Sequence, residues 1–554
     1  MPLTVSDVLR RHDALKKLRH PYEALWKDVT DFILPRRSFW DIEEEGGKLP
    51  AQKLYDGTGV AELQLLVDGT LGSMISPHLR WIHLTMEDRR QNEIPWVADW
   101  LEELEDIFYA EFARSNFYEA ISEFFTDAAA IGTAVMFHDD YIEQKGLLFS
   151  TRHMKECYIA EGRDQRVDTV FREFNIPNRV AAQIWGNSLS LRRRDLVRAQ
   201  PYAQARIIHA CFPRSDRNPS KIDQLNKPWA SLYIDKQFHE NSFLDQGGYD
   251  TFPYLVWRWR KNSGEAHGWG PGTDAIQDVR RMNQVAKSNL QMRQIAGDPP
   301  LNVPEAMRGH ERIVPRGYNY YTKPDEVIFP INLGQNYPIA KDEEEHIREQ
   351  IRNIFRTKMY TLLEQLEGGP FTATEIRERQ GEKATVQGPM IARLTSECLI
   401  PLIRRSYAIL EQNGLLPPPP EELAAGGRIH IEFNGPLALQ TKKYHQSQGI
   451  DNGIIYIQAM REMFPESLDN VDGDELMRIG LDSKAMPQRA IREKPQVTKV
   501  REIRAEEAQR EEQQAVGLEQ QKMLAQNAEK LNKPMNPDSM LAGIGKAAKT
   551  APKR

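Results

Sequence analysis

Two long helical patterns bracket a segment in which a long helix cannot form. Residues 273–296 and 342–366 carry apolar residues at helical spacing, and seven prolines lie between them, within 297–341. Proline lacks the amide hydrogen that a helix needs and fixes its own φ angle. The chain must therefore leave the first helix, build short extended pieces and enter a second helix. A helix of 24 residues is about 36 Å long, so we expect this module to be held away from the rest of the protein.

The second helical pattern ends at an abrupt break. Gly368, Gly369 and Pro370 interrupt the stretch "LEQLEGGPFTATEIRERQG". Thr372 and Glu375 then have the spacing of a capping box, which predicts that a new helix begins there. On the residues alone, an ordinary turn between two helices is the favoured interpretation. A mobile loop with a function of its own is the alternative.

The first half of the chain mixes helices with short strands. Helical patterns cover 1–35, 57–75, 94–114 and 117–136, and "RWIHLTM" (80–86) alternates like a strand. Between about 134 and 260 the period shortens, and seven strand-like segments are separated by turns and by one helical insertion at 178–200. The fold class we predict is α+β and helix-dominated, without the regular strand–helix alternation of a doubly wound sheet.

The C-terminal part changes character twice. The helix after the glycine break is expected to reach Gly414, followed by the polyproline spacer "PPPPEEL", the strand "RIHIEF" and helices at 438–464 and 472–493. From 495 onward the sequence favours helix but has almost no apolar face. Such a helix is marginal alone, although identical helices packed around an axis could stabilise it. The last residues, ending in "KAAKTAPKR", are expected to form a flexible tail.

Composition limits the class of protein. A chain of 554 residues should fold into two to four units. Its net charge of -6 argues against a surface that grips nucleic acid everywhere, although a protein that lets nucleic acid slide past needs no basic surface. No apolar run is long enough for a bilayer, and no signal-peptide core precedes the first helix. Three scattered cysteines, Cys157, Cys211 and Cys398, predict buried thiols in a reducing compartment.

Motifs for catalysis are weak throughout. The chain has no phosphate-binding GxxxxGK[ST], no HExxH and no GxSxG, and "GIGKAAK" lacks the Ser or Thr that the first requires. "GWGPG" (268–272) could cradle an anion, but a helix-start turn is favoured. "HDD" at His138 and "HAC" at His209 lack metal-ligand spacing, and structural roles are favoured. The run Arg192–Arg194 could meet phosphates, yet Asp195 beside it favours a solvated helix face. We therefore expect no catalytic residue, no metal site and no cofactor.

Several stretches together resemble the portal proteins, or head-to-tail connectors, of short-tailed bacteriophages (podoviruses). They are "PYEALWKDVTDFILPRR", "YDGTGVAELQLLVDGTLGSMISPHLRWIHL", "AIGTAVMF", "GPGTDAIQDVRRMN", "FTATEIRERQ", "NGPLALQTK" and "VDGDELMRIGLDSKAMPQRAIREKPQV". Each piece is only weakly specific, whereas their order and spacing are more so. The likeness extends to about residue 500.

The resemblance implies a ring subunit whose parts follow one another along the chain. These parts are the wing (1–271), the first stem helix (272–296), the clip (297–341), the second stem helix (342–363), the tunnel loop (364–372), a long wing helix with a spacer (373–430), the crown (431–494), a barrel helix (495–530) and a flexible tail (531–554). With the resemblance, the glycine break is better interpreted as the tunnel loop at the narrow point of a DNA channel than as an ordinary turn.

The tunnel loop is the first candidate site. Its residues are Glu364, Gln365, Glu367, Gly368, Gly369, Pro370, Phe371 and Thr372. Some relatives place an arginine or lysine in this loop, but here no basic residue occurs before Arg377. Acidic rings at the constriction would repel DNA, so that it slides rather than adheres. The expected positive charge of the channel falls instead to Arg280, Lys287 and Arg293 in the first stem helix.

The resemblance also implies partners and a location. The chain would form a ring, usually of twelve copies, around viral double-stranded DNA at one capsid vertex. It would bind the terminase large subunit, tail adaptor proteins, and the major capsid and scaffold proteins, and no membrane. It would be made in the host bacterial cytoplasm and reside in the virion. Two alternatives compete: a head–tail adaptor or scaffold protein without a channel, and a metal-dependent hydrolase that uses scattered acidic residues and His138.

Overall fold

A computed structural model describes residues 3–35, 54–78, 80–88, 90–141, 145–297, 301–303, 305, 308–309, 323, 327–330, 337–361, 387–421, 428–433, 453, 456–457, 472–483, 496–509 and 522–523. The chain divides into two compact units, Met1–Tyr444 and His445–Arg554. The first unit holds the large hydrophobic core and the candidate site.

The helix α4 (Phe117–Ile131) lies at the centre of this core. It contacts three helices that precede it, α1 (Val5–Phe32), α2 (Thr58–Met74) and α3 (Pro95–Arg114), as well as the strands that follow it. Ten of its side chains are buried, because "FYEAISEFFTDAAAI" is apolar on nearly every face. The predicted extension to residue 136 is wrong. Gly132 adopts φ +94°, a left-handed conformation that ends the helix, and a strand begins at once.

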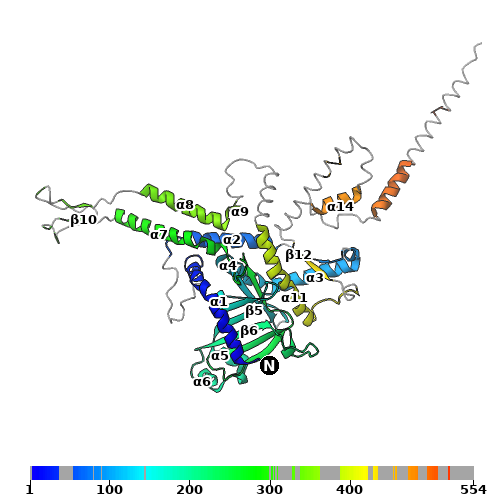
Figure 1. Ribbon diagram of the computed structural model, residues 1–554. Coiled ribbons are helices and arrows are strands. Elements are labelled where there is room, and N and C mark those ends of the chain that lie inside the picture. The colour runs from blue at the N-terminus through cyan, green and yellow to red at the C-terminus, as the bar shows by residue number, and fades with distance from the viewer. Residues whose placement is uncertain are drawn as a thin grey trace, which may run out of the picture. The chain divides into compact units, whose positions relative to one another are not determined.

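Two antiparallel sheets pack beneath these helices (Figure 1). The smaller has the order β3-β2-β9, and the larger has the order β4-β5-β6-β7-β8. Their bounds are β2 Thr133–Tyr141, β3 Gly146–Arg152, β4 Cys157–Glu161, β5 Val167–Pro177, β6 Gln204–Pro213, β7 Trp229–Asp235, β8 Asp245–Tyr249 and β9 Tyr254–Arg258. All seven predicted strands are confirmed. β8 was not predicted, because its sequence, "DQGGY", is polar and contains two glycines, which are depleted in strands.

An aromatic cluster joins the helices to the smaller sheet. The ring of Trp81 stacks at 5.9 Å from Phe112, whose ring lies 4.5 Å from Phe117. Phe117 in turn meets Phe149 of β3 at 5.1 Å, edge to face. All four side chains are almost completely buried. Such contacts stabilise by roughly 0.5–1.5 kcal/mol per pair beyond the burial of their area, so this cluster fixes α3 and α4 on the sheet.

The insertion between β5 and β6 forms two short helices, α5 (Asn178–Trp185) and α6 (Leu191–Ala199). Arg193 is 1% exposed and binds Asp235 with two hydrogen bonds of 2.7 and 3.0 Å. Arg192 and Arg194 are exposed. The basic run therefore divides between a structural ion pair and the solvated face that the sequence favoured.

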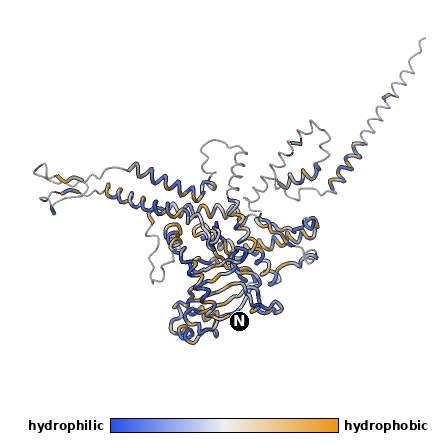
Figure 2. The backbone as a smooth tube through the Cα atoms, in the orientation of Figure 1, coloured by the Kyte–Doolittle hydropathy of each residue, from blue (hydrophilic) through white to orange (hydrophobic). Residues whose placement is uncertain are grey.

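Two helices, α7 (Pro271–Gly297) and α8 (Tyr337–Phe355), lie side by side and extend away from the sheets (Figure 1). Figure 2 shows hydrophilic and hydrophobic residues intermixed along both of them. Between them, the short strands β10 (Leu301–Asn302) and β11 (Phe329–Pro330) pair, as expected for a proline-rich segment of extended pieces.

The bounds of both long helices differ from the predicted ones. α7 begins at Pro271 rather than at a Thr273 cap, because proline suits the first helical turn. α8 begins five residues before 342 and ends at Phe355, where Arg356 has φ +55°. A short helix, α9 (Lys358–Thr361), follows. The sequence pattern 342–366 continues through this break in apolar residues and so concealed it.

The described part of the first unit resumes at residue 387. Residues 387–394 are helical, a π-helical turn spans Thr395–Leu399, and α11 (Ile400–Gln412) follows directly. β12 (Ile429–Phe433) then pairs with β1 (Ile82–Met86), which joins segments that are far apart in the sequence. The predicted boundary between spacer and crown, at 430/431, falls inside this strand.

The second unit is described only in part. α14 (Gly473–Ser483) lies within the predicted helix 472–493, and residues 496–509 are also helical. Arg501 binds Asp474 at 2.6 Å. Every residue from 501 to 509 is exposed, in agreement with a helix that lacks an apolar face. Most of the predicted crown, barrel and tail lies outside the described residues. None of the described helices is both long and apolar enough to cross a membrane.

Candidate functional site

The two long helices α7 and α8 pack against each other, and they lie in the segments that the resemblance assigns to the stem. The buried side of α8 carries Ile347, Ile351 and Phe355, all at most 1% exposed, at the spacing of one helical face. Polar contacts accompany this seam: Asn289 binds Glu344, and Arg281 binds Glu343 at 2.9 Å. The seam is therefore apolar near the sheets, with polar contacts that fix the register of the two helices.

Glycines seat the beginning of α7 against the end of α4. A Cβ atom on Gly268 would meet the carbonyl oxygen of Gly132, and one on Gly270 would meet that of Ala128. The backbone amide of Gly268 also donates to the hydroxyl of Thr133 at 2.8 Å. "GWGPG" therefore serves close backbone packing at the start of α7, in agreement with the favoured helix-start interpretation.

The three predicted channel cations do not gather at one place. Arg280 binds Asp28 of α1 at 3.0 Å, and the ammonium of Lys287 lies 5.6 Å from the ring centre of Tyr55. These two side chains lie seven residues apart and share a helix face, whereas Arg293 is six residues further and points differently. Arg293 is exposed near the end of α7. Their role toward DNA stays a prediction.

The predicted tunnel loop lies outside the described residues. This applies to Glu364, Gln365, Glu367, Gly368, Gly369, Pro370, Phe371 and Thr372. The structure describes both of its flanks, the break between α8 and α9 on one side and the helix from residue 387 on the other.

The first flank is fastened to α2. Thr357, 2% exposed, donates a hydrogen bond to Glu62, and the guanidinium of Arg352 lies 3.4 Å from the same carboxylate. Further along, the hydroxyl groups of Tyr360 and Thr70 lie 2.8 Å apart. The chain from the end of α8 to α9 is thus bound to α2 by these polar contacts.

The Tyr360 hydroxyl also receives a hydrogen bond from Gln387, the first residue described after that segment. Burial raises the pKa of Tyr360, while the hydrogen bonds with Thr70 and Gln387 act to lower it. The hydroxyl therefore stays protonated at neutral pH and can donate one bond while it accepts another. A side chain of the first flank thus contacts the second flank directly.

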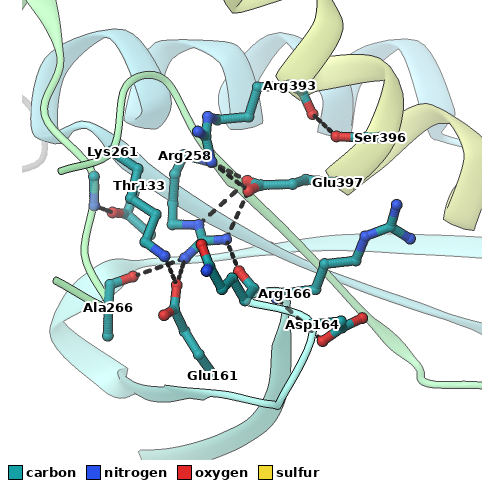
Figure 3. A network of polar contacts seen from close by, with 12 residues as sticks. Thr133, Glu161, Asp164, Arg166, Arg258, Lys261, Ala266, Arg393, Ser396 and Glu397 are labelled. Carbon is teal, nitrogen blue, oxygen red and sulfur yellow. Dashed lines mark hydrogen bonds and ion pairs between the residues drawn. The ribbon is translucent and has the colours of Figure 1, made fainter. Parts of the chain in front are cut away.

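The second flank is fastened by Glu397, in the π-helical turn (Figure 3). Its carboxylate accepts hydrogen bonds from Arg258 of β9: 3.0 Å from the backbone amide, 3.3 Å from Nε and 2.6 Å from Nη2. Arg393, one turn earlier, adds a bond of 2.9 Å. Arg258 is completely buried and Glu397 is 6% exposed. A π turn offsets the helix register and often marks a functional position; here it carries a carboxylate that binds the sheet.

Other groups complete the shell of Arg258. Glu161 forms a second ion pair with it, and the carbonyl oxygens of Gln165 and Ala266 accept further hydrogen bonds. Lys261 shares Glu161 at 2.6 Å (Figure 3). The buried charge is therefore compensated from several directions, as buried ions must be.

Sequence reasoning missed Tyr360, Arg258 and Glu397. Two signals were available. Glu397 is the one acidic residue in "LTSECLIPLI", and Arg258 interrupts the apolar strand "YLVWRW". A lone charge in an apolar pattern predicts a buried ion pair, but the pattern does not say which of many carboxylates is the partner.

The hydrolase alternative finds little support in the described part of the chain. There, no three His, Cys, Asp or Glu side chains converge as metal ligands would. His138 is fully buried and stacks on Phe149 at 4.4 Å, and its burial keeps its pKa well below the usual value. His209 bonds the hydroxyls of Tyr254 and Ser231 at 2.7 and 3.0 Å. Both histidines are parts of the core.

The predicted burial of the three cysteines is confirmed. Cys157, Cys211 and Cys398 are free and completely buried. Burial raises the pKa of each thiol far above its ordinary value. Buried thiols of raised pKa are unreactive, so they act as small apolar side chains.

Fold and site define a class of protein: a helix-rich α+β protein in which the paired helices α7 and α8 extend from a core of helices and antiparallel sheets. The chain belongs to the family of bacteriophage head to tail connecting proteins, whose profile matches residues 5–491. The match to the family therefore extends over nearly the whole chain, as the resemblance in the sequence predicted.

Two relatives are similar over almost their full lengths. The probable portal protein of Bordetella phage BPP-1 is 29% identical over 521 residues, with 92% of each chain covered. The portal protein of Salmonella phage epsilon15 is 25% identical over 559 residues, with 98% of each chain covered. A solved structure, the neck of an empty GTA particle, shares 11% identity at a TM-score of 0.31, over 76% of this chain and 95% of its own. That score is too low to decide any feature of the fold.

Proposed function

We propose that this chain is the portal subunit of a phage capsid. Copies close into a ring, twelve in number, at one vertex, and the viral double-stranded DNA is packaged and ejected through its centre. The observation that carries the proposal is the match of nearly the whole chain to the head to tail connecting family, to a probable portal protein and to a portal protein. Such a ring lets DNA pass through it and binds the motor and the tail. ATP is therefore hydrolysed by a separate motor protein and not by this chain.

The parts of the ring are assigned from the resemblance. The stem pair α7 and α8 lines the channel, and the proline-rich segment between them is the clip, which binds the terminase large subunit and later the tail adaptors. The first unit's sheets and helices form the wing, which faces the major capsid and scaffold proteins. The ring resides in the virion after synthesis in the bacterial cytoplasm. The stem pair that extends from the sheets supports this arrangement.

The channel passes DNA by weak adhesion. Glu364 and Glu367 would place acidic rings at the tunnel loop, and like charges on DNA and wall disfavour sticking. Arg280 is paired with Asp28, which reduces the cationic charge offered by that part of the stem. Arg280, Lys287 and Arg293 are the candidates for contact with phosphates.

Native mass spectrometry with negative-stain images tests the proposal first. The portal reading predicts a closed ring of about twelve copies with a central hole, formed by the purified chain or with scaffold protein added. A compact dimer that persists in the presence of scaffold would refute it. A ring without a through-hole would instead support the adaptor alternative.

The tunnel loop needs its own test. Replacing Gly368 and Gly369 with alanine favours continuation of the helix by about 1 kcal/mol per site. Rings should still assemble, while the amount of DNA packaged or retained should fall. Replacing Gly72, an exposed glycine within α2 with open space around it, is the matched control. Packaging at the level of this control would refute a moving loop at that position.

A further inference from the structure

The hydroxyl group of Tyr360 occupies an unusual place in the chain. It lies in α9, immediately before the segment that holds the predicted tunnel loop, and it bonds Gln387, immediately after that segment. It also lies 2.8 Å from the hydroxyl of Thr70, in the middle of α2. Thr70 lies 290 positions and Gln387 lies 27 positions from Tyr360 in the sequence, and both contact its hydroxyl oxygen.

The residues of α2 that contact Tyr360 fit its side chain closely. Thr70 is completely buried and Gln387 is 7% exposed, so water competes little for either group. The Tyr360 ring covers Gly69, where a Cβ atom would overlap the ring. Only glycine lets the aromatic ring approach the helix this closely.

The Tyr360 hydroxyl makes two hydrogen bonds. A tyrosine hydroxyl has one hydrogen to donate and lone pairs to accept. The amide nitrogen of Gln387 can only donate, so Tyr360 accepts from it, and the hydroxyls of Tyr360 and Thr70 share a second bond in which either can be the donor. A phenylalanine would keep the ring over Gly69 and lose both bonds.

We propose that Tyr360 is a positioning residue for the tunnel loop, holding the two chain ends that carry the loop at one point on α2. The inference rests on the proposed function, since it assigns the loop to the DNA channel. Force on the loop from moving DNA then passes through Tyr360 and Gln387 into α2 and the wing core, instead of separating the two ends. The helix beyond Gln387 is fixed again at Glu397, so the held end is short and stiff.

Hydrogen–deuterium exchange on assembled rings tests the positioning. In Tyr360→Phe, amides of residues 355–361 and 387–394 should exchange roughly tenfold faster, which corresponds to about 1.4 kcal/mol. An effect of this size is expected for the loss of two hydrogen bonds. Thr70→Val should reproduce part of the effect, and Thr70→Ser, which keeps the hydroxyl, should not. Unchanged exchange in both Tyr360→Phe and Thr70→Val would overturn the proposal.

Tyr109→Phe is the matched control. Its hydroxyl also makes two hydrogen bonds, both to the backbone of Ile82, but it lies between α3 and β1. It should leave exchange at 355–361 and 387–394 unchanged, whatever it does to overall stability. Faster exchange at those two segments in Tyr109→Phe would mean that the effect is general loosening, and would overturn the proposal.

DNA content separates this inference from the proposed function. Particles built with Tyr360→Phe should assemble rings normally but hold less DNA than particles built with Tyr109→Phe. Equal DNA contents would overturn a role of Tyr360 in the channel while leaving the portal function intact. A wild-type chain that supports no packaging at all would overturn the portal function itself.

Discussion

Replacing Glu397 with glutamine should strongly destabilise the first unit, although the two side chains have nearly the same shape. The carboxylate accepts from four donors: Oε1 from Arg393 and from Nη2 of Arg258, and Oε2 from the backbone amide and Nε of Arg258. A glutamine has one acceptor oxygen and one donor nitrogen. Whichever way the amide turns, its NH2 group faces donors, and the buried guanidinium loses part of its counter-charge.

The magnitude follows from the burial of this pair. Removing one partner of a buried ion pair costs about 3–5 kcal/mol. Glu161 still compensates Arg258 in the variant, so we expect the lower end, about 3 kcal/mol. Domains are stable by only about 5–15 kcal/mol, so the loss is a large fraction of the total.

Equilibrium unfolding in urea, followed by tryptophan fluorescence, is the assay. With an m-value of about 3 kcal/mol per M, the midpoint should fall by about 1 M. Trp257 adjoins Arg258 and is fully buried, so its emission reports this region. Glu305→Gln is the control, since Glu305 is 88% exposed beside Arg308 and should leave the midpoint unchanged. Equal midpoints for the two variants would refute the argument from burial.

Three further predictions concern pH, backbone and the insertion. Burial lowers the pKa of His209 to about 3 in the folded protein, whereas its value in the unfolded chain is near 6.5. The neutral imidazole therefore contributes its full share to the free energy of unfolding above pH 6.5. This share is lost as the pH falls from 6.5 toward 3, by at most 1.36 kcal/mol per pH unit. Acid titration of unfolding should show this slope, and His209→Gln should flatten it. Gly132→Ala should cost about 1–3 kcal/mol in thermal unfolding because of its φ of +94° and the backbone atoms around it, whereas Gly72→Ala should stabilise by up to about 1 kcal/mol. Arg193→Met should cost about 3–5 kcal/mol by leaving the carboxylate of Asp235 buried without its ion-pair partner; an unchanged urea midpoint would contradict this.

Local pattern predicted most of the elements in the described part of the chain. Helices such as α1, α2 and α3 and the strands of the two sheets were predicted because period and turn residues are local properties, read within a few residues. The misses have local causes too. A helix was carried past Gly132, whose left-handed conformation the period does not reveal, and the apolar stripe of α8 continued through the break at Arg356.

The sequence by itself determined the α+β class, the two long helices on either side of a proline-rich segment and the family to which the chain is similar. Only the tertiary structure decided which distant groups meet: Tyr360 with Thr70 and Gln387, and Arg258 with Glu397. The reason is physical. The period of a helix or strand is a property of neighbouring residues. A buried hydroxyl or charge, in contrast, can be satisfied by any suitable partner that the fold brings within about 3 Å. With 73 basic and 79 acidic residues in the chain, the sequence alone does not say which partner that is.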